Sequence, residues 1–208
     1  MATIFISHSK KDEDLVLVME KTLKNMGHTP IIEEFVPAEE RKSVPHKEIR
    51  SNVEKSEFLF LFLTDNVMAT EYTRSWVIWE SGLASADSKK LFVFERIGTP
   101  IKLPIPYLTD YALFDPDNTG DILALQHITK DLGKFRRDIL TAVGGAVVGS
   151  AFGPVGMALG AILGYTAGPK QPKPPVVKCS YCNVSFNYYS SRHRAFSCPS
   201  CRRSINLR

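Results

Sequence analysis

The chain has 208 residues, 44% of them hydrophobic and 23% charged, and its net charge is +4. These values are ordinary for a soluble globular protein, and they exclude a chain too small or too polar to bury a core of its own. Met1 runs almost directly into an apolar segment, without the charged and then apolar leader of a secreted protein, so we expect a cytoplasmic location.

Charge is distributed unevenly along the chain. All 22 Asp and Glu residues lie at or before Asp138, together with 18 of the 26 Lys and Arg residues, which gives this part a net charge of −4. The other eight basic residues begin at Lys170, and no acid accompanies them. We therefore expect a boundary near residue 140 and different partners for the two parts.

Residues 1–140 alternate between two patterns. Short apolar runs such as Phe58 to Leu63 predict strands buried on both faces. Apolar residues at a helical period predict helices, and Gly27 ends the first of them. The predicted strands cover 4–6, 29–32, 58–63, 91–94 and 111–114, the last at an edge, and the predicted helices cover 12–26, 46–55, 72–86 and 117–140. This alternation predicts an α/β fold with a flavodoxin-like, doubly wound parallel sheet.

Three shorter segments follow the α/β domain of residues 1–140. Residues 141–168 contain no charge and eight of the 13 glycines. Residues 169–177 form a proline-rich linker, and residues 178–208 hold all four cysteines.

Ligands of doubly wound sheets bind at the carboxyl ends of the strands, near the point where the strand order reverses. The helix that follows the central predicted strand carries Trp76, Trp79 and Glu80. Two tryptophans within a turn of a glutamate would surround a carboxylate with flat apolar surface. Taken alone, however, this pattern more often marks two core tryptophans and a solvated glutamate.

Residues 2–140 resemble a Toll/interleukin-1 receptor (TIR) domain in the order and spacing of four segments. These are IFISHSKKDEDLV, a proline-containing loop, the LFLFL strand and WVIWESGLA. The resemblance implies an NAD+ glycohydrolase, in some members a cyclase, in which the glutamate of the last segment is essential. It places the essential carboxylate at Glu80, a supporting ring at Trp76, a polar substrate-binding pair at Ser9 and Lys10, and an acidic substrate contact at Glu39.

A single carboxylate suits the reaction that the resemblance implies. Cleavage between ribose C1′ and the pyridinium nitrogen releases neutral nicotinamide, so the leaving group needs no proton donor and the step needs no metal. A carboxylate beside an aromatic wall stabilises the positive charge that builds on the ribose. Water as the attacking group gives ADP-ribose and a ribose hydroxyl gives a cyclic isomer, and the sequence leaves both open.

The resemblance also implies that activity depends on assembly, because the active site in this family often forms between neighbouring TIR units. Self-association is then the switch, in stress or antiviral defence. The alternative is a non-catalytic TIR adaptor that recruits other TIR proteins to a membrane or to nucleic acid.

Glycines recur at every fourth position within residues 141–168, at Gly145, Gly149 and Gly153 and again from Gly156 to Gly168. On a helix this spacing forms a face on which backbones approach closely. Basic residues flank both ends, and a hairpin that enters a membrane and returns keeps both ends on the cytoplasmic side. We expect such a self-associating glycine-zipper hairpin, and the alternative is a soluble tail that packs on the domain.

The cysteines form two C-x-x-C pairs separated by 15 residues, Cys179 with Cys182 and Cys198 with Cys201. This spacing predicts structural Zn²⁺ in a zinc-ribbon-like tail, while the alternative of two disulfides is disfavoured in the cytoplasm. The interleaved basic and aromatic residues suit nucleic acid, an anionic membrane surface or an acidic partner. We expect removal of residues 141–208 to lower the activity of dilute protein and to spare the fold.

Overall fold

The computed structural model describes residues 1–35, 46–99, 101, 103–130, 132, 174–190 and 192–207. In chain order the elements are β1 (Thr3–Ser9), the short 3-10 helix η1 (Lys10–Asp12), α1 (Glu13–Asn25), β2 (Thr29–Phe35), α2 (His46–Lys55), β3 (Phe58–Leu63), α3 (Asp65–Met68), α4 (Glu71–Ala86), β4 (Lys90–Arg96), β5 (Asp110–Phe114), α5 (Thr119–Lys130), β6 (Val176–Lys178), β7 (Ser185–Tyr188), β8 (Ala195–Ser197) and β9 (Ser204–Asn206). The glycine segment of residues 141–168 lies outside the described residues, as do residues 133–140 of the last predicted helix.

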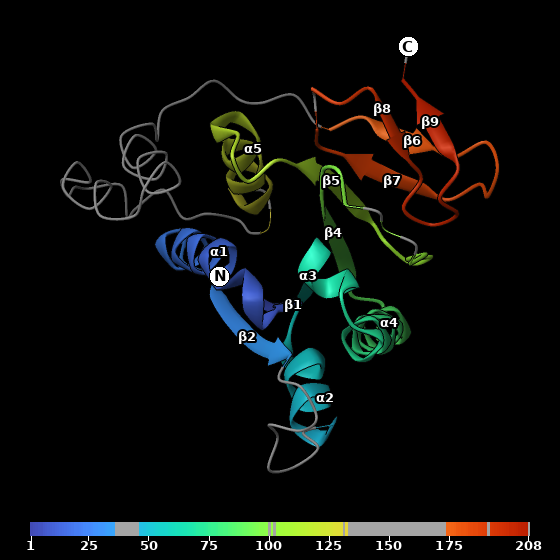
Figure 1. The fold of residues 1–208 in the computed structure, drawn as a ribbon. Helices are drawn as coiled ribbons and strands as arrows, with labels where there is room; N and C mark the ends of the chain where they lie inside the picture. Colours follow the sequence, from blue (N-terminus) through green and yellow to red (C-terminus); the bar gives the residue numbers. More distant parts are fainter. Residues whose placement is uncertain are drawn as a thin grey trace.

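One seven-stranded sheet organises the molecule, with its strands in the order β2-β1-β3-β4-β5-β7-β6 (Figure 1). The first five strands are parallel to one another. The order 2-1-3-4-5 reverses between β1 and β3, as in flavodoxin-like doubly wound sheets. The predicted α/β fold with a flavodoxin-like parallel sheet is therefore confirmed.

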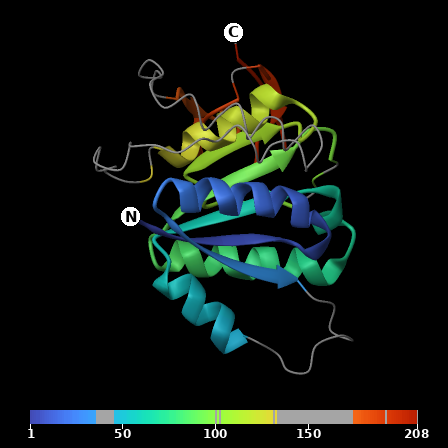
Figure 2. The same ribbon diagram turned by 90° about the vertical axis from the view of Figure 1, so that its left-hand side faces the viewer.

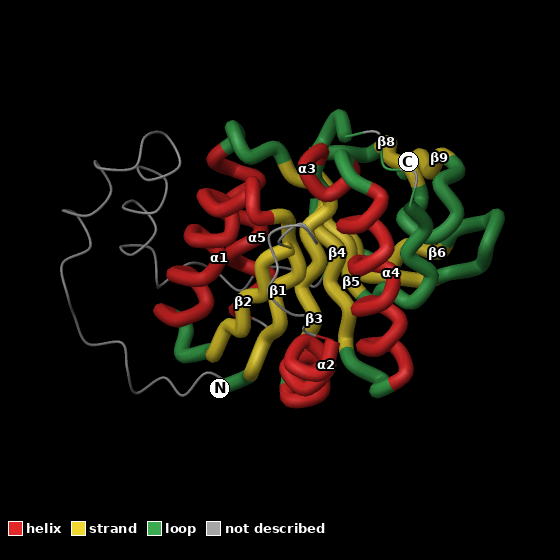
Figure 3. Tube along the Cα trace, turned by 60° about the horizontal axis from the view of Figure 1, so that its bottom comes forward, coloured by secondary structure: helices red, strands yellow, loops and turns green. Residues whose placement is uncertain are grey.

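Alternation along the strands divides the core into two halves, one on each face of the sheet. Odd-numbered positions such as Phe5 and Leu61 pack with α2, α3 and α4. Even-numbered positions such as Ile4 and Phe60 pack with α1 and α5. Figure 3 shows α1 and α5 on one side of the sheet and α4 on the other, and in Figure 2 α1 and α5 run side by side. Ser7 and Ser9 are also odd-numbered and belong to the face that α4 covers.

Most predicted elements agree with the structure, and the differences are local. The helix predicted over residues 46–55 is α2 and the strand predicted over 58–63 is β3. β1 extends past Ile6 because its backbone stays paired with β2 as far as Ser9. α3, a single turn that was not predicted, begins where the Thr64 hydroxyl accepts a hydrogen bond from the backbone N–H of Val67 at 3.2 Å.

The strand predicted at an edge of the sheet, β5, instead lies inside it, because the chain returns from residue 174 onward and covers it. We call residues 174–207 the tail. Its strand β7 pairs with β5 in parallel and with β6 in antiparallel orientation. The backbone N–H of Asn187 donates to the carbonyl of Thr109 at 3.0 Å, and that of Tyr189 to Tyr111 at 3.1 Å.

The tail also shares its hydrophobic core with the α/β domain. Phe186, Tyr188 and Phe196 belong to the same buried cluster as Leu91 and Tyr111. In Figure 1 the orange and red tail stands beside β5, at the opposite end of the sheet from β2. Among the described residues, no helix combines the length and apolar character needed to cross a bilayer.

Candidate functional site

Glu80 lies in the middle of α4, on the side that the helix turns toward the sheet. The buried residues of α4 recur at helical spacing: Thr73, Trp76, Val77, Glu80, Ser81 and Ala84. Glu80 has no exposed surface at all. An apolar residue is expected at such a position, because burying a carboxylate carries a large desolvation cost. Glu80 is therefore a functional candidate and not a solvated helix residue.

An aromatic pocket of about 430 Å³ lies where α4 meets the start of α2. Its wall is formed by His46, Tyr72, Ser75, Trp76 and Trp79. The His46 ring stacks on Trp76 with a centroid distance of 5.7 Å, while Tyr72 and Trp79 meet Trp76 edge-on at 6.0 and 5.1 Å. A rigid wall of rings open to solvent suits a flat ligand ring.

The loops that follow β1 and β3, at the point where the strand order reverses, are fastened to each other. The buried carboxylate of Asp12 accepts hydrogen bonds from the Thr64 hydroxyl and the Asn66 amide, each at 2.6 Å. Ser9 is buried and its hydroxyl caps η1, whereas Lys10 is exposed. Ligands of this fold typically bind in the crevice between these two loops. Here hydrogen bonds hold the two loops together, and the cationic side chain of Lys10 lies beside them.

The predicted site residues fall into three groups in the structure. Trp76 and Glu80 lie one turn apart on the buried side of α4, and Ser9 and Lys10 stand where β1 ends. The pocket wall includes Trp76 but not Glu80, Ser9 or Lys10. Glu39 lies outside the described residues, in the connection between β2 and α2.

Two polar residues of the same elements escaped sequence reasoning. Ser7 is fully buried on the α4 face, and its hydroxyl has no hydrogen-bond partner within the part of the chain that the structure describes. Asp12 is the first residue of the helix predicted over 12–26, where an acidic residue is common, so its position alone does not reveal that it joins two loops. The signal for its real role was the polar run Thr64-Asp65-Asn66 directly after the apolar β3, because the loops after β1 and β3 meet in this fold.

The four predicted metal ligands converge in the tail. Their sulfur atoms all lie within 4.8 Å of one another. The Sγ–Sγ distance is 3.7 Å between Cys179 and Cys201 and also between Cys182 and Cys198. A tetrahedron of sulfurs at about 2.3 Å from zinc has edges of about 3.8 Å, whereas a disulfide requires about 2.05 Å. The four free thiols therefore fit a closed metal site.

The two C-x-x-C loops, or knuckles, are built alike. In each, the backbone N–H of the first cysteine donates to the carbonyl five residues later, at 2.9 Å for Cys179 and 2.8 Å for Cys198. The residue four positions on, Asn183 or Arg202, has a positive φ of 60° or 62° and returns its N–H to the first cysteine's carbonyl. Burial raises the pKa of the Cys179 thiol, but backbone N–H groups of the knuckle outweigh burial and lower it to about 7. In the first knuckle these donors favour the thiolate of Cys179, the form that binds metal, whereas burial raises the pKa of Cys198 in the second knuckle.

Arg202 fastens the second knuckle to the central sheet. Its guanidinium donates to the carbonyl of Leu103 at 2.9 and 2.6 Å and to the carboxylate of Glu95 at 2.6 Å. The pKa of Glu95 is raised because burial outweighs the opposing effect of Arg202. A positive φ costs arginine about 1 kcal/mol or more, whereas asparagine adopts it readily, as Asn183 does in the first knuckle. The strained arginine is placed where its side chain joins the tail to β4.

Replacing Arg202 with alanine is expected to destabilise the protein by about 3–5 kcal/mol, because Glu95 then stays buried without its cation. The double variant with Glu95→Gln should recover much of this loss, since no buried charge remains. Urea unfolding followed by tryptophan fluorescence measures both variants. A double variant no more stable than Arg202→Ala would show that the ion pair is not what joins the tail to the sheet.

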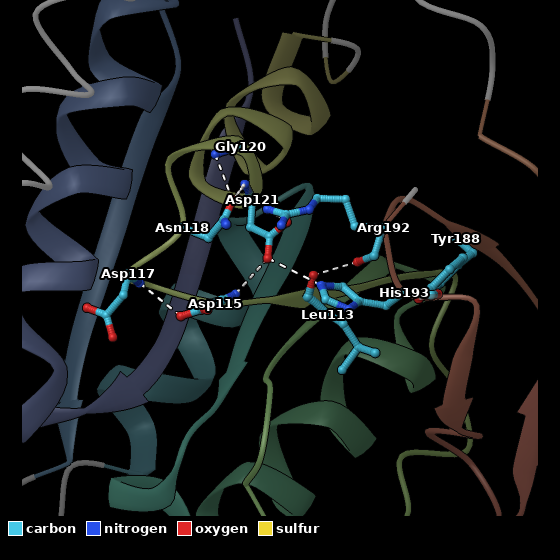
Figure 4. Close-up of polar contacts among 10 residues, drawn as sticks. Leu113, Asp115, Asp117, Asn118, Gly120, Asp121, Tyr188, Arg192 and His193 are labelled. Atoms are coloured by element: carbon cyan, nitrogen blue, oxygen red, sulfur yellow. Dashed lines mark hydrogen bonds and ion pairs between the residues drawn. The ribbon is translucent and has the colours of Figure 1, made fainter.

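A second polar contact between the tail and the α/β domain is centred on Asp121, in the first turn of α5 (Figure 4). Its carboxylate accepts a hydrogen bond from the backbone N–H of Asp115 at 3.0 Å. The same carboxylate lies 3.4 Å from Nε2 of His193 and 4.0 Å from the guanidinium of Arg192. The Tyr188 hydroxyl donates to the carbonyl of His193 and holds this loop in place. Basic tail residues thus meet acidic domain residues at both contacts.

Comparisons with known proteins assign no family to this chain. A scan of protein-family models finds none that matches, and a search of curated proteins finds no relative. Function is therefore inferred from the site itself.

Proposed function

We propose that the chain is a TIR-type NAD+ glycohydrolase, which cleaves the bond between nicotinamide and ribose with Glu80 as its essential carboxylate. The observation that carries this proposal is the complete burial of Glu80 within a helix face that otherwise packs on the sheet. One turn away, Trp76 forms part of the wall of the aromatic pocket. The same helix therefore carries a buried carboxylate and, one turn away, part of the wall of an aromatic pocket that Glu80 itself does not line.

The carboxylate of Glu80 stabilises the positive charge that develops on the ribose as the bond to nicotinamide lengthens. Charge stabilisation is stronger at a buried position than in water, because the surroundings are less polar and already ordered. Nicotinamide leaves as a neutral ring, so no second residue has to donate a proton. The rings of Trp76 and Trp79 offer the electron-poor pyridinium a face of opposite polarity. The attacking group is water or a ribose hydroxyl, which gives ADP-ribose or a cyclic isomer.

The remaining predicted residues have supporting roles in this proposal. Lys10, exposed at the carboxyl end of β1, suits the pyrophosphate of NAD+, and Ser9 beside it forms the turn that presents it. Glu39 is the acidic substrate contact. The thiolates of Cys179, Cys182, Cys198 and Cys201 hold a structural Zn²⁺, which fixes the tail and takes no part in the reaction. Self-association activates the enzyme in stress or antiviral defence in the cytoplasm, through the TIR unit and through residues 141–168, which also attach it to a membrane.

The proposal is tested by incubating the purified full chain with NAD+ over a wide range of protein concentration, with and without a crowding agent. Chromatography then separates nicotinamide from ADP-ribose and its cyclic isomers. We expect one nicotinamide for each NAD+ consumed and a specific activity that rises with protein concentration. No release at any concentration would contradict an enzyme and favour the adaptor.

A further inference from the structure

The tail carries positive charge on a surface with no acid of its own. No Asp or Glu follows Asp138 in the sequence. Four basic side chains of the tail are exposed: Lys178, Arg192, Arg194 and Arg203. Arg202 instead forms an ion pair with Glu95. The acidic domain and the basic tail therefore differ in sign of net charge, and a polyanion is attracted to the tail more strongly than to the domain.

Tyr181 and Arg203 form an exposed pair at the metal site. Tyr181 lies between the two cysteines of the first knuckle and is 58% exposed. Arg203 follows the second knuckle, and its guanidinium carbon lies 4.8 Å from the centroid of the Tyr181 ring. The carbonyl of Arg203 is itself held by the backbone N–H of Cys198 at 2.8 Å. The two side chains come from different knuckles, so the fold of the four-cysteine site brings them together.

The hairpin of β8 and β9 adds a flat polar face next to this pair. Its outward positions carry only small side chains: Ala195, Ser197, Ser204 and Asn206. Arg194 precedes β8 and Arg203 precedes β9, and both are exposed, so in this antiparallel pair they stand at opposite ends of the hairpin. Arg203 is level with Cys198, four residues along from Arg194, so at about 3.3 Å per residue the two arginines are about 13 Å apart along the strands. Hydroxyl and amide groups between two arginines suit a chain of phosphates.

These features favour nucleic acid over a lipid surface. Side chains that enter lipid are typically Trp, Phe or Leu beside basic residues. The only large apolar side chains that are strongly exposed among the described tail residues are Val176 and Tyr181. A tyrosine with one face against a guanidinium leaves its other face for a base, and the guanidinium reaches phosphate.

We propose that the tail binds single-stranded nucleic acid, with a base stacked on Tyr181 and phosphates bound by Arg203 and Arg194 across the β8–β9 face. This interaction goes beyond the proposed cleavage of NAD+ and does not depend on it. Binding and turnover are separate properties, and Glu80→Gln should bind the strand as the wild type does.

The test is fluorescence anisotropy of a labelled oligothymidylate, longer than the about 4–16 nucleotides that one small domain covers, titrated with the full zinc-loaded chain. We expect binding that weakens steeply with salt, a loss of about tenfold or more for Tyr181→Ala, and for Arg203→Gln a weaker affinity with a salt slope smaller by roughly 0.7. Tyr107→Ala is the matched control, because Tyr107 is 59% exposed in the β4–β5 connection. Arg50→Gln on α2 is the control for the loss of one exposed positive charge.

Zinc content and unfolding midpoint are measured for each variant, to show that the exposed substitutions leave the tail folded. No binding by the wild type at low salt would overturn the proposal. Equal losses of oligonucleotide affinity in the tail variants and in their controls would also overturn it. Binding to phosphatidylserine vesicles without binding to the oligonucleotide would replace nucleic acid with lipid, and equal affinity for duplex and single strand would remove the stacking role of Tyr181.

Discussion

Glu80→Gln is expected to lower the rate of nicotinamide release from NAD+ by about 100- to 1,000-fold. Glutamine keeps the size of the side chain and removes the charge that stabilises the developing ribosyl cation. Because the position is fully buried, the neutral amide also avoids the desolvation cost of a carboxylate. We therefore expect an unfolding midpoint that is unchanged or higher. Activity lost without a loss of stability distinguishes a catalytic carboxylate from a structural one.

The matched control is Glu71→Gln, at the exposed first position of the same helix. It removes one negative charge from α4 without touching the buried side, so nicotinamide release should stay close to that of the wild type. Similar losses in the two variants would point to the helix as a whole and not to the carboxylate of Glu80. A Glu80→Gln protein that is inactive and also much less stable would indicate a structural role.

Loss of the metal is expected to destabilise the whole protein and not only the tail. A tail of about thirty residues is too small to maintain a hydrophobic core without the bound metal. Once the tail unfolds, β5 becomes an edge strand of the sheet. Tyr111 loses its ring contacts with Phe186 and Tyr188, and Glu95 loses its ion pair with Arg202. These losses amount to several kcal/mol, and in a chain of this size each kcal/mol moves the unfolding midpoint by about 2–4 °C. We expect a fall of about 10 °C or more on chelation, and a similar fall in a Cys179→Ser, Cys198→Ser double variant.

Tryptophan fluorescence is the decisive readout, because both tryptophans of the chain, Trp76 and Trp79, lie on α4, which belongs to the α/β domain and not to the tail. A chelator should lower the midpoint that they report in the wild type and should have no further effect on the cysteine double variant. An unchanged tryptophan midpoint after the metal is removed would mean that the tail and the α/β domain unfold independently.

The same contacts revise the expectation that removal of residues 141–208 spares the fold. The Tyr111 ring is fully buried and lies 5.7 Å from Phe186, 6.0 Å from Tyr188 and 5.7 Å from Phe196. Truncation at residue 140 would expose these apolar surfaces together with the edge of β5. A variant that tests the glycine segment should therefore keep the tail and replace residues 141–168 alone.

Local patterns predicted the first five strands because each buried strand carries its own signal, as the apolar run of β3 does. They also predicted that Trp76 and Glu80 are neighbours, because helical spacing fixes that relation. The position of β7 could not be predicted in this way. Its strand is short and alternates weakly, and its partner lies 77 residues earlier in the chain, where Asp110 accepts a hydrogen bond from Asn187 at 2.9 Å.

The cysteine spacing predicted the metal site but not where the site docks. Docking depends on Arg202, whose role becomes visible only when Glu95 and Leu103 are placed beside it by other elements. The aromatic pocket shows the same limit. Trp76 and Trp79 were evident from the sequence, while His46 joins them from α2, across a connection that sequence patterns do not position.

The most direct test of the central claim is nicotinamide release from NAD+ by wild-type and Glu80→Gln protein, compared at the same high protein concentration. Release by the wild type that falls at least 100-fold in the variant, with both proteins folded, is the result expected from a buried catalytic carboxylate. Equal release by the two proteins would contradict the role of Glu80, and no release by either would contradict the enzyme.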